Sequence, residues 1–194
     1  MCASNVGRCD WRRVTSRVFA PLLLLHHRNA RFHPVQQLRS GALTGNVDFA
    51  PTILELAGVE VPAGLDGRSL LPLYSTPSAS IHDSLPLINV WGPIEVHSLG
   101  VVTRDWKYIY WNYAEGNFEA TEELYDLARD PYELKNLAAD ASQSDRLQEM
   151  QTLYDQHVAA WKLLAVPYND YRKYATIFDR TLPWAQKRPL VRRK

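Results

Sequence analysis

The sequence predicts an α/β protein, more closely an α+β fragment in which a small antiparallel sheet packs on a long C-terminal helix. Residues 101–104, 106–113 and 122–127 alternate β-branched or aromatic side chains with polar ones, which is typical of half-buried strands. Residues 144–165 place apolar side chains at three- and four-residue spacing, which is typical of an amphipathic helix. A chain of 194 residues is long enough for one domain with a sizeable core.

The first 43 residues are the least patterned part of the chain. Residues 18–25 form a short apolar run that is typical of one buried strand but far short of the ~20 residues of a membrane span. His26 and His27 follow it without a small-residue cleavage site, so no functional signal peptide is predicted and the compartment stays unknown. Cys2 and Cys9 indicate neither a disulfide framework nor a zinc site.

Residues 48–57 predict a helix. Asp48 is expected to cap it, Pro51 suits its first turn, and Gly58 ends it. One apolar face is expected on this helix, formed by Phe49, Ile53, Leu56 and Ala57. In the loop that follows, Asp66 and Arg68 are expected to pair and to fix the backbone.

The second half begins after a polar linker, with a strand over residues 85–91 that Gly92-Pro93 ends. The meander follows, with a turn at residues 115–117, because Gly and Asn tolerate positive φ. Ser142 or Ser144 is expected to cap the long helix, and Pro167 stops it. The end of the chain has no clear period and is expected to be a solvated basic tail. We therefore divide the chain into residues 1–43, 44–83, 84–171 and 172–194.

Two stretches resemble a known family. Residues 46–58, NVDFAPTILELAG, precede DGRSL at 66–70, and ELYDL at 123–127 precedes DPYEL at 130–134 and NLA at 136–138. In this order they are similar to the C-terminal part of the type I sulfatases, which are arylsulfatase-like enzymes of the alkaline-phosphatase superfamily. The resemblance implies that residues 44–83 end a sulfatase α/β domain and that residues 84–171 form its C-terminal subdomain.

The resemblance implies hydrolysis of sulfuric esters, with sulfated carbohydrate or an aryl sulfate as substrate. The family uses calcium and a formylglycine made from Cys or Ser in a Cys/Ser-x-Pro-x-Arg motif, and these groups lie N-terminal to the segment that residue 46 begins. We therefore predict no catalytic residue and no metal ligand in this chain, and no activity of the chain alone, as for a truncated product or an incomplete gene model. Intact members are commonly exported.

The sequence offers only weak substitutes for that chemistry. Residues 9–13, CDWRR, have cysteine and arginine at the motif's spacing but Trp11 in the proline position, so the likeness is attributed to chance. No Asp-rich cluster suggests calcium. His26 and His27 are neighbours that would face opposite ways in a strand, and His157 is expected to pack beside the helical stripe. Serine-nucleophile, phosphate-loop and dinucleotide motifs are absent.

Trp91 and His97 flank the Gly92-Pro93 loop at a strand edge. In a complete sulfatase such loops border the substrate pocket, so the resemblance makes these two residues the candidate substrate-binding residues. The competing interpretation is a loop residue and a core tryptophan, because aromatic residues at strand ends are usually core.

The formal charge of +1 gives no argument for binding nucleic acid or a membrane. An alternative function is a non-catalytic module that associates with a sulfatase partner or a sulfated glycan. Apolar surface that a larger parent would cover, such as residues 18–25 and the Phe49 face, then favours self-association.

Overall fold

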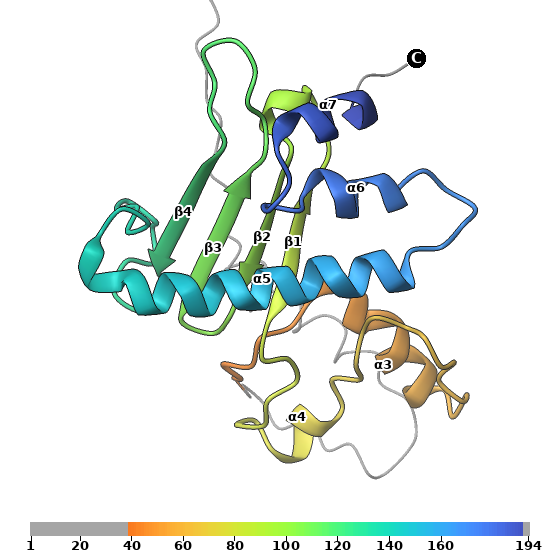
Figure 1. Cartoon of the computed structure of the whole chain (residues 1–194). Helices are drawn as coiled ribbons and strands as arrows, with labels where there is room; N and C mark the ends of the chain where they lie inside the picture. The colour runs from red at the N-terminus through yellow and green to blue at the C-terminus, as the bar shows by residue number, and fades with distance from the viewer. Residues whose placement is uncertain (1–38, 192–194) are drawn as a thin grey trace, which may run out of the picture. The chain divides into compact units, whose positions relative to one another are not determined.

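The computed structural model describes residues 39–191 (Figure 1). The predictions for residues 9–13, 18–25 and His26–His27 therefore lie outside the described residues. The chain divides into two compact units, Met1–His82 and Asp83–Lys194, and each is described by itself. None of the described helices is long and apolar enough to cross a membrane.

The first unit contains η1 (Asn46–Asp48), α3 (Phe49–Leu56) and α4 (Pro72–Ser75). The predicted helix is confirmed as α3, with Pro51 in its first turn and Gly58 just after it at φ 70°. The predicted apolar face is only partly covered, as expected for a surface that a larger parent would cover. Pro51 and Thr52 are buried, whereas Ile53 is 50% and Leu56 46% exposed.

A small apolar cluster lies in this unit. Its buried members are Leu70, Leu73 and Ile81, with Phe49 packed against them. In residues 39–82, the described part of this unit, polar contacts add to this small cluster.

The second unit is built on one antiparallel sheet with the strand order β1-β2-β3-β4. Its strands are β1 (Leu85–Asn89), β2 (Ser98–Val102), β3 (Trp106–Trp111) and β4 (Thr121–Asp126). The predicted meander is confirmed, with β2 starting three residues before the expected residue 101. Gly116, at φ 68°, lies in the connection between β3 and β4, where a turn was expected.

The long helix α5 (Ser144–Leu164) runs across one face of this sheet (Figure 1). Met150, Tyr154 and Val158 recur every four residues along it and are buried. They join a core with side chains of β2, β3 and β4, namely Leu99, Val101, Tyr108, Tyr110 and Leu124. Full burial of such side chains contributes about 1.5–3 kcal/mol each. The predicted packing of sheet on helix is therefore confirmed.

The expected serine cap of this helix was wrong. A short 3₁₀ turn, η3 (Ala141–Gln143), precedes α5, and the Asp140 carboxylate accepts a hydrogen bond from the Ser142 amide at 3.0 Å. The side chain that stabilises the entry to α5 is therefore that of Asp140, although α5 itself begins at Ser144 as expected.

The prediction of a solvated C-terminal tail was also wrong. The chain forms α6 (Arg172–Ile177) and α7 (Trp184–Val191) on the same side of the sheet as α5 (Figure 1). Ile177 and Phe178 are fully buried in the main core, and Lys187 is only 1% exposed. Residues 172–191 therefore complete the core of the second unit.

Candidate functional site

Asp48 is a fully buried carboxylate of the first unit. Its Oδ1 accepts hydrogen bonds from the Arg68 amide at 2.8 Å and from His82 Nε2 at 2.7 Å. Its Oδ2 accepts one from the Gly45 amide at 2.7 Å. This carboxylate therefore joins three segments and makes no capping bond to α3, which corrects the predicted role.

The expected Asp66–Arg68 pair is not formed. The Arg68 guanidinium instead donates to the carbonyl of Ile81 at 2.8 Å. Gly67, between them, lies against the backbone of Val47. A Cβ at this position would stand 1.9 Å from the Val47 carbonyl oxygen, so no larger residue fits without a shift. The DGRSL motif thus holds the loop against η1, with Gly required for the close approach.

Calcium does not fit this part of the chain. Both oxygens of Asp48 are occupied by N–H donors, whereas a calcium site needs several free oxygens that converge. Among residues 39–191, no group of three or more His, Cys, Asp or Glu side chains lies close enough to hold a metal ion.

The acidic side chains around the end of β4 bind backbone amides. Asp126 Oδ1 accepts hydrogen bonds from two following amides at 3.1 and 3.0 Å. Asp130 Oδ2 accepts from two more at 2.7 and 2.9 Å. These bonds hold the turn after β4, where Glu133 takes a positive φ of 57°. The DPYEL stretch therefore fixes a turn rather than presenting an acid to a substrate.

Asn136 continues the same pattern at the edge of β4. Its Oδ1 accepts from the amides of Leu124 at 3.0 Å and Ala138 at 2.9 Å, and its Nδ2 donates to the Glu122 carbonyl at 3.1 Å. The side chain takes the place of a neighbouring strand and satisfies backbone groups that the sheet would leave open.

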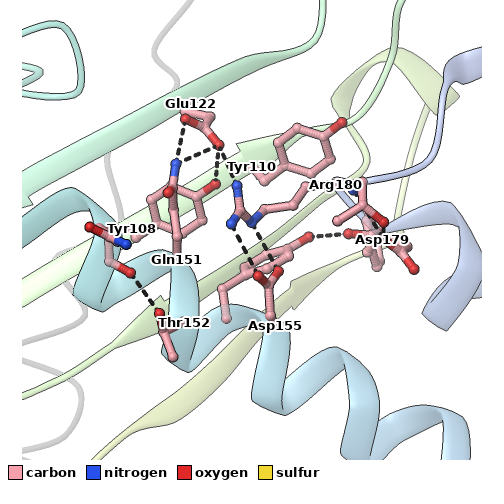
Figure 2. A network of polar contacts seen from close by, with 12 residues as sticks. Tyr108, Tyr110, Glu122, Gln151, Thr152, Asp155, Asp179 and Arg180 are labelled. Carbon is pink, nitrogen blue, oxygen red and sulfur yellow. Dashed lines mark hydrogen bonds and ion pairs between the residues drawn. The ribbon is translucent and has the colours of Figure 1, made fainter. Parts of the chain in front are cut away.

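Figure 2 shows a polar network where β3, β4 and α5 meet the segment after α6. Glu122 accepts from Tyr108 Oη at 2.6 Å and from Gln151 Nε2 at 3.0 Å. Arg180 binds Asp155 through two parallel hydrogen bonds, 2.9 and 3.0 Å long. Burial, and then the hydrogen bond to Glu122, raise the pKa of Tyr108, so its hydroxyl stays a proton donor to the carboxylate. The network ties the C-terminal segment to the sheet.

His157, expected to pack beside the apolar stripe, is half-buried on α5. Its Nε2 lies 2.9 Å from the hydroxyl of Ser84, which directly precedes β1. Burial lowers the pKa of His157. The neutral ring therefore serves as a packing group and a hydrogen-bond partner.

The two predicted substrate-binding residues have different environments. Trp91, just after β1, is 77% exposed and is not a core tryptophan. His97, between η2 (Ile94–Val96) and β2, is only 6% exposed, and its carbonyl accepts from Asn112 Nδ2 at 2.7 Å. Burial lowers the pKa of the His97 imidazole. The structure thus presents one of the two to solvent and encloses the other.

Comparison with known proteins identifies the family. The family model described as N-sulphoglucosamine sulphohydrolase, C-terminal, matches residues 10–160. This chain belongs to that sulfatase family. The matched range includes the stretches around Asp48 and Asn136, whose side chains hold backbone in place in this structure.

Individual sulfatases show the same relationship. Arylsulfatase K of Xenopus laevis is 35% identical over 138 residues, which cover 67% of this chain and 24% of that protein. The delta 4,5-hexuronate-2-O-sulfatase of Bacteroides thetaiotaomicron is 37% identical over 129 residues, 65% of this chain and 24% of that protein. This sulfatase chain thus spans about a quarter of the length of these relatives.

A solved structure confirms the fold of the same part. The structure of BT4656 in complex with its substrate D-glucosamine-2-N,6-O-disulfate superposes with a TM-score of 0.53 at 31% identity. The match covers 60% of this sulfatase chain and 24% of that chain.

Proposed function

We propose that this chain is the C-terminal portion of a sulfuric ester hydrolase that, when whole, acts on sulfated carbohydrate. The observation that supports it most is the family match over residues 10–160. Two similar proteins, the hexuronate-2-O-sulfatase and BT4656, bear names or descriptions that specify sulfated sugars. In this proposal the second unit supplies a rigid sheet and the Trp91–His97 loop borders the substrate.

The chain alone is proposed to be inactive. Cleavage of a sulfate ester needs a nucleophile, a positive group that neutralises the sulfate oxygens, and a proton donor for the leaving alcohol. The sequence lacks the Cys/Ser-x-Pro-x-Arg motif, and Asp48, Asp126 and Asp130 are occupied by N–H groups. The proposed contribution of this portion is therefore to hold and border a site whose reacting groups lie elsewhere in the enzyme.

A turnover assay tests this proposal. The purified chain is incubated with 4-nitrocatechol sulfate and calcium, beside an active arylsulfatase as the positive control and buffer as the blank. We expect release of nitrocatechol at the rate of the blank. Hydrolysis above the blank that follows the concentration of the chain would contradict the proposal.

A second candidate function, association with a partner, is favoured by the surface of α3. Ile53, Leu56 and Val59 are 50%, 46% and 52% exposed within a few residues of one another. Grouped apolar exposure of this kind marks partner sites. In this alternative the chain binds a sulfatase partner or another copy of itself through α3.

Light scattering during size exclusion tests the association. We expect an apparent mass that rises with concentration in the wild type and falls to that of the monomer in Ile53→Glu. Ser78→Glu is the control, because it adds the same charge at an exposed turn of the same unit. A monomer at all concentrations in the wild type would remove self-association.

A further inference from the structure

Helices α6 and α7 lie C-terminal to residue 160, where the family match ends. They pack beside α5 and complete the core of the second unit (Figure 1). Tyr174 of α6 stacks on the fully buried ring of Phe178, with 5.8 Å between ring centroids. Its ring also meets the His97 imidazole edge-on, at 5.9 Å and 63°. The segment after residue 160 thus contacts one of the two predicted substrate residues, His97.

The His97 imidazole is enclosed without being satisfied. Both ring nitrogens are buried, and neither makes a hydrogen bond of normal geometry to the residues that the structure describes. The backbone of Gly92 faces the ring and favours its protonated form without completing such a bond. A buried polar group left unpaired costs about 1–3 kcal/mol. An unrestrained imidazole would therefore turn toward water.

The charged groups around the ring do not relieve this. Glu95 on η2 and Lys173 on α6 act on the imidazole with opposite signs. Lys173 is paired with the carboxylate of Asp170 and lies over the Tyr174 ring, 5.5 Å from its centroid. The packing of Tyr174 on α6 against the ring is a contact that can hold the imidazole in place.

We propose that Tyr174 is a positioning residue for His97, and that α6 is a clamp which keeps the imidazole dry and in one orientation next to the Trp91–Gly92 loop. In this proposal the fold keeps both ring nitrogens of His97 free of structural hydrogen bonds. The functional consequence is a loop with one fixed arrangement before a sulfated sugar arrives. That consequence rests on the proposed function, whereas the clamp itself does not.

Diethyl pyrocarbonate labelling of the full chain, read by mass spectrometry at His97, tests the clamp. In the wild type we expect labelling at least tenfold slower than for N-acetylhistidine. Tyr174→Phe keeps the ring and should keep this protection, and Tyr168→Ala is the control at an 84% exposed tyrosine. Tyr174→Ala should bring labelling to within a few-fold of the reference. Tyr174→Leu, which keeps apolar volume and so guards the fold, should do the same.

An NMR titration of the imidazole gives a second readout, which reports on the surroundings of His97 itself. In folded Tyr174→Ala or Tyr174→Leu, the pKa of His97 should rise from its lowered value toward the ordinary ~6.5. Unchanged labelling and an unchanged pKa in either folded variant would overturn the clamp. A failure of glucosamine 6-sulfate to shift the wild-type Trp91 and His97 signals would instead overturn the substrate role and leave the clamp standing.

Discussion

The two units of this chain are stabilised in opposite ways. In the described part of the first unit, residues 39–82, one fully buried carboxylate, Asp48, joins three segments, and the apolar cluster has three buried side chains. The second buries a sheet against three helices and keeps its charged network, around Arg180, at the border of that core. A single polar group should therefore matter far more in the first unit than in the second.

The largest effect is expected at Asp48. Asp48→Ala leaves the amides of Gly45 and Arg68 and the ring of His82 without their acceptor, which should cost about 3–5 kcal/mol of the first unit's stability. Hydrogen exchange at the Gly45 and Arg68 amides measures it locally. Asp66→Ala, in the same loop and outside this junction, should change exchange by less than ~0.5 kcal/mol. Equal effects of the two variants would refute the special role of Asp48.

A smaller effect is expected at Arg180 in the second unit. Arg180→Ala removes the two parallel bonds to Asp155 and the 3.7 Å ion pair with Glu122, at a cost of about 1–3 kcal/mol. Urea unfolding followed by tryptophan fluorescence measures it. Arg129→Ala is the matched control, since the Arg129 side chain is 88% exposed and 3.8 Å from Asp126, where a pair contributes little. If Arg180→Ala lowered the free energy of unfolding as much as Asp48→Ala does, the proposed difference between the two units would be contradicted.

The smallest effect is a pH dependence from Lys187. Burial lowers the pKa of Lys187 from 10.5 to about 8, with its ammonium 3.1 Å from Tyr110 Oη. Between these two values the unfolded chain binds more protons than the folded one, so the free energy of unfolding should rise with pH. The rise should be on the order of 1–2 kcal/mol between pH 8 and 10.

Above pH ~10 the trend should reverse, because burial raises the pKa of Tyr108 and Tyr154 and the unfolded chain then loses these protons first. Denaturant titrations across this range measure both limbs. Lys187→Met should abolish the rise and leave the fall. A rise that persists in Lys187→Met would assign it to another group.

Strong local periods made the second unit predictable. The apolar stripe that includes Met150, Tyr154 and Val158 predicted α5. The alternation of apolar and polar side chains predicted the strands. Both patterns arise because helix and strand impose these periods on any buried face. Contacts far apart in sequence were not predictable. The bonds from Asp48 to Arg68 and His82 span 20 and 34 residues, so Asp48 read only as a cap.

The C-terminal helices were missed for a different reason. Helices α6 and α7 have six and eight residues, too few for a clear period, and Pro183 interrupts the segment between them. Lys187 lies in a basic stretch that favours a solvated tail, and only the fold shows it buried beside Tyr110. For the site, Trp91 and His97 stay a prediction from the sequence. The contact between His97 and Tyr174 joins residues 77 positions apart, so no local sequence pattern could have predicted it.

We propose that this sulfatase chain borders a site for a sulfated sugar and does not supply the groups that cleave the ester. A single NMR experiment tests both parts, with the chain, glucosamine 6-sulfate and calcium in one sample. The Trp91 indole signal should shift, and no signals of the desulfated sugar should appear over a day. Appearance of the desulfated sugar, or no shift at Trp91, would contradict the claim.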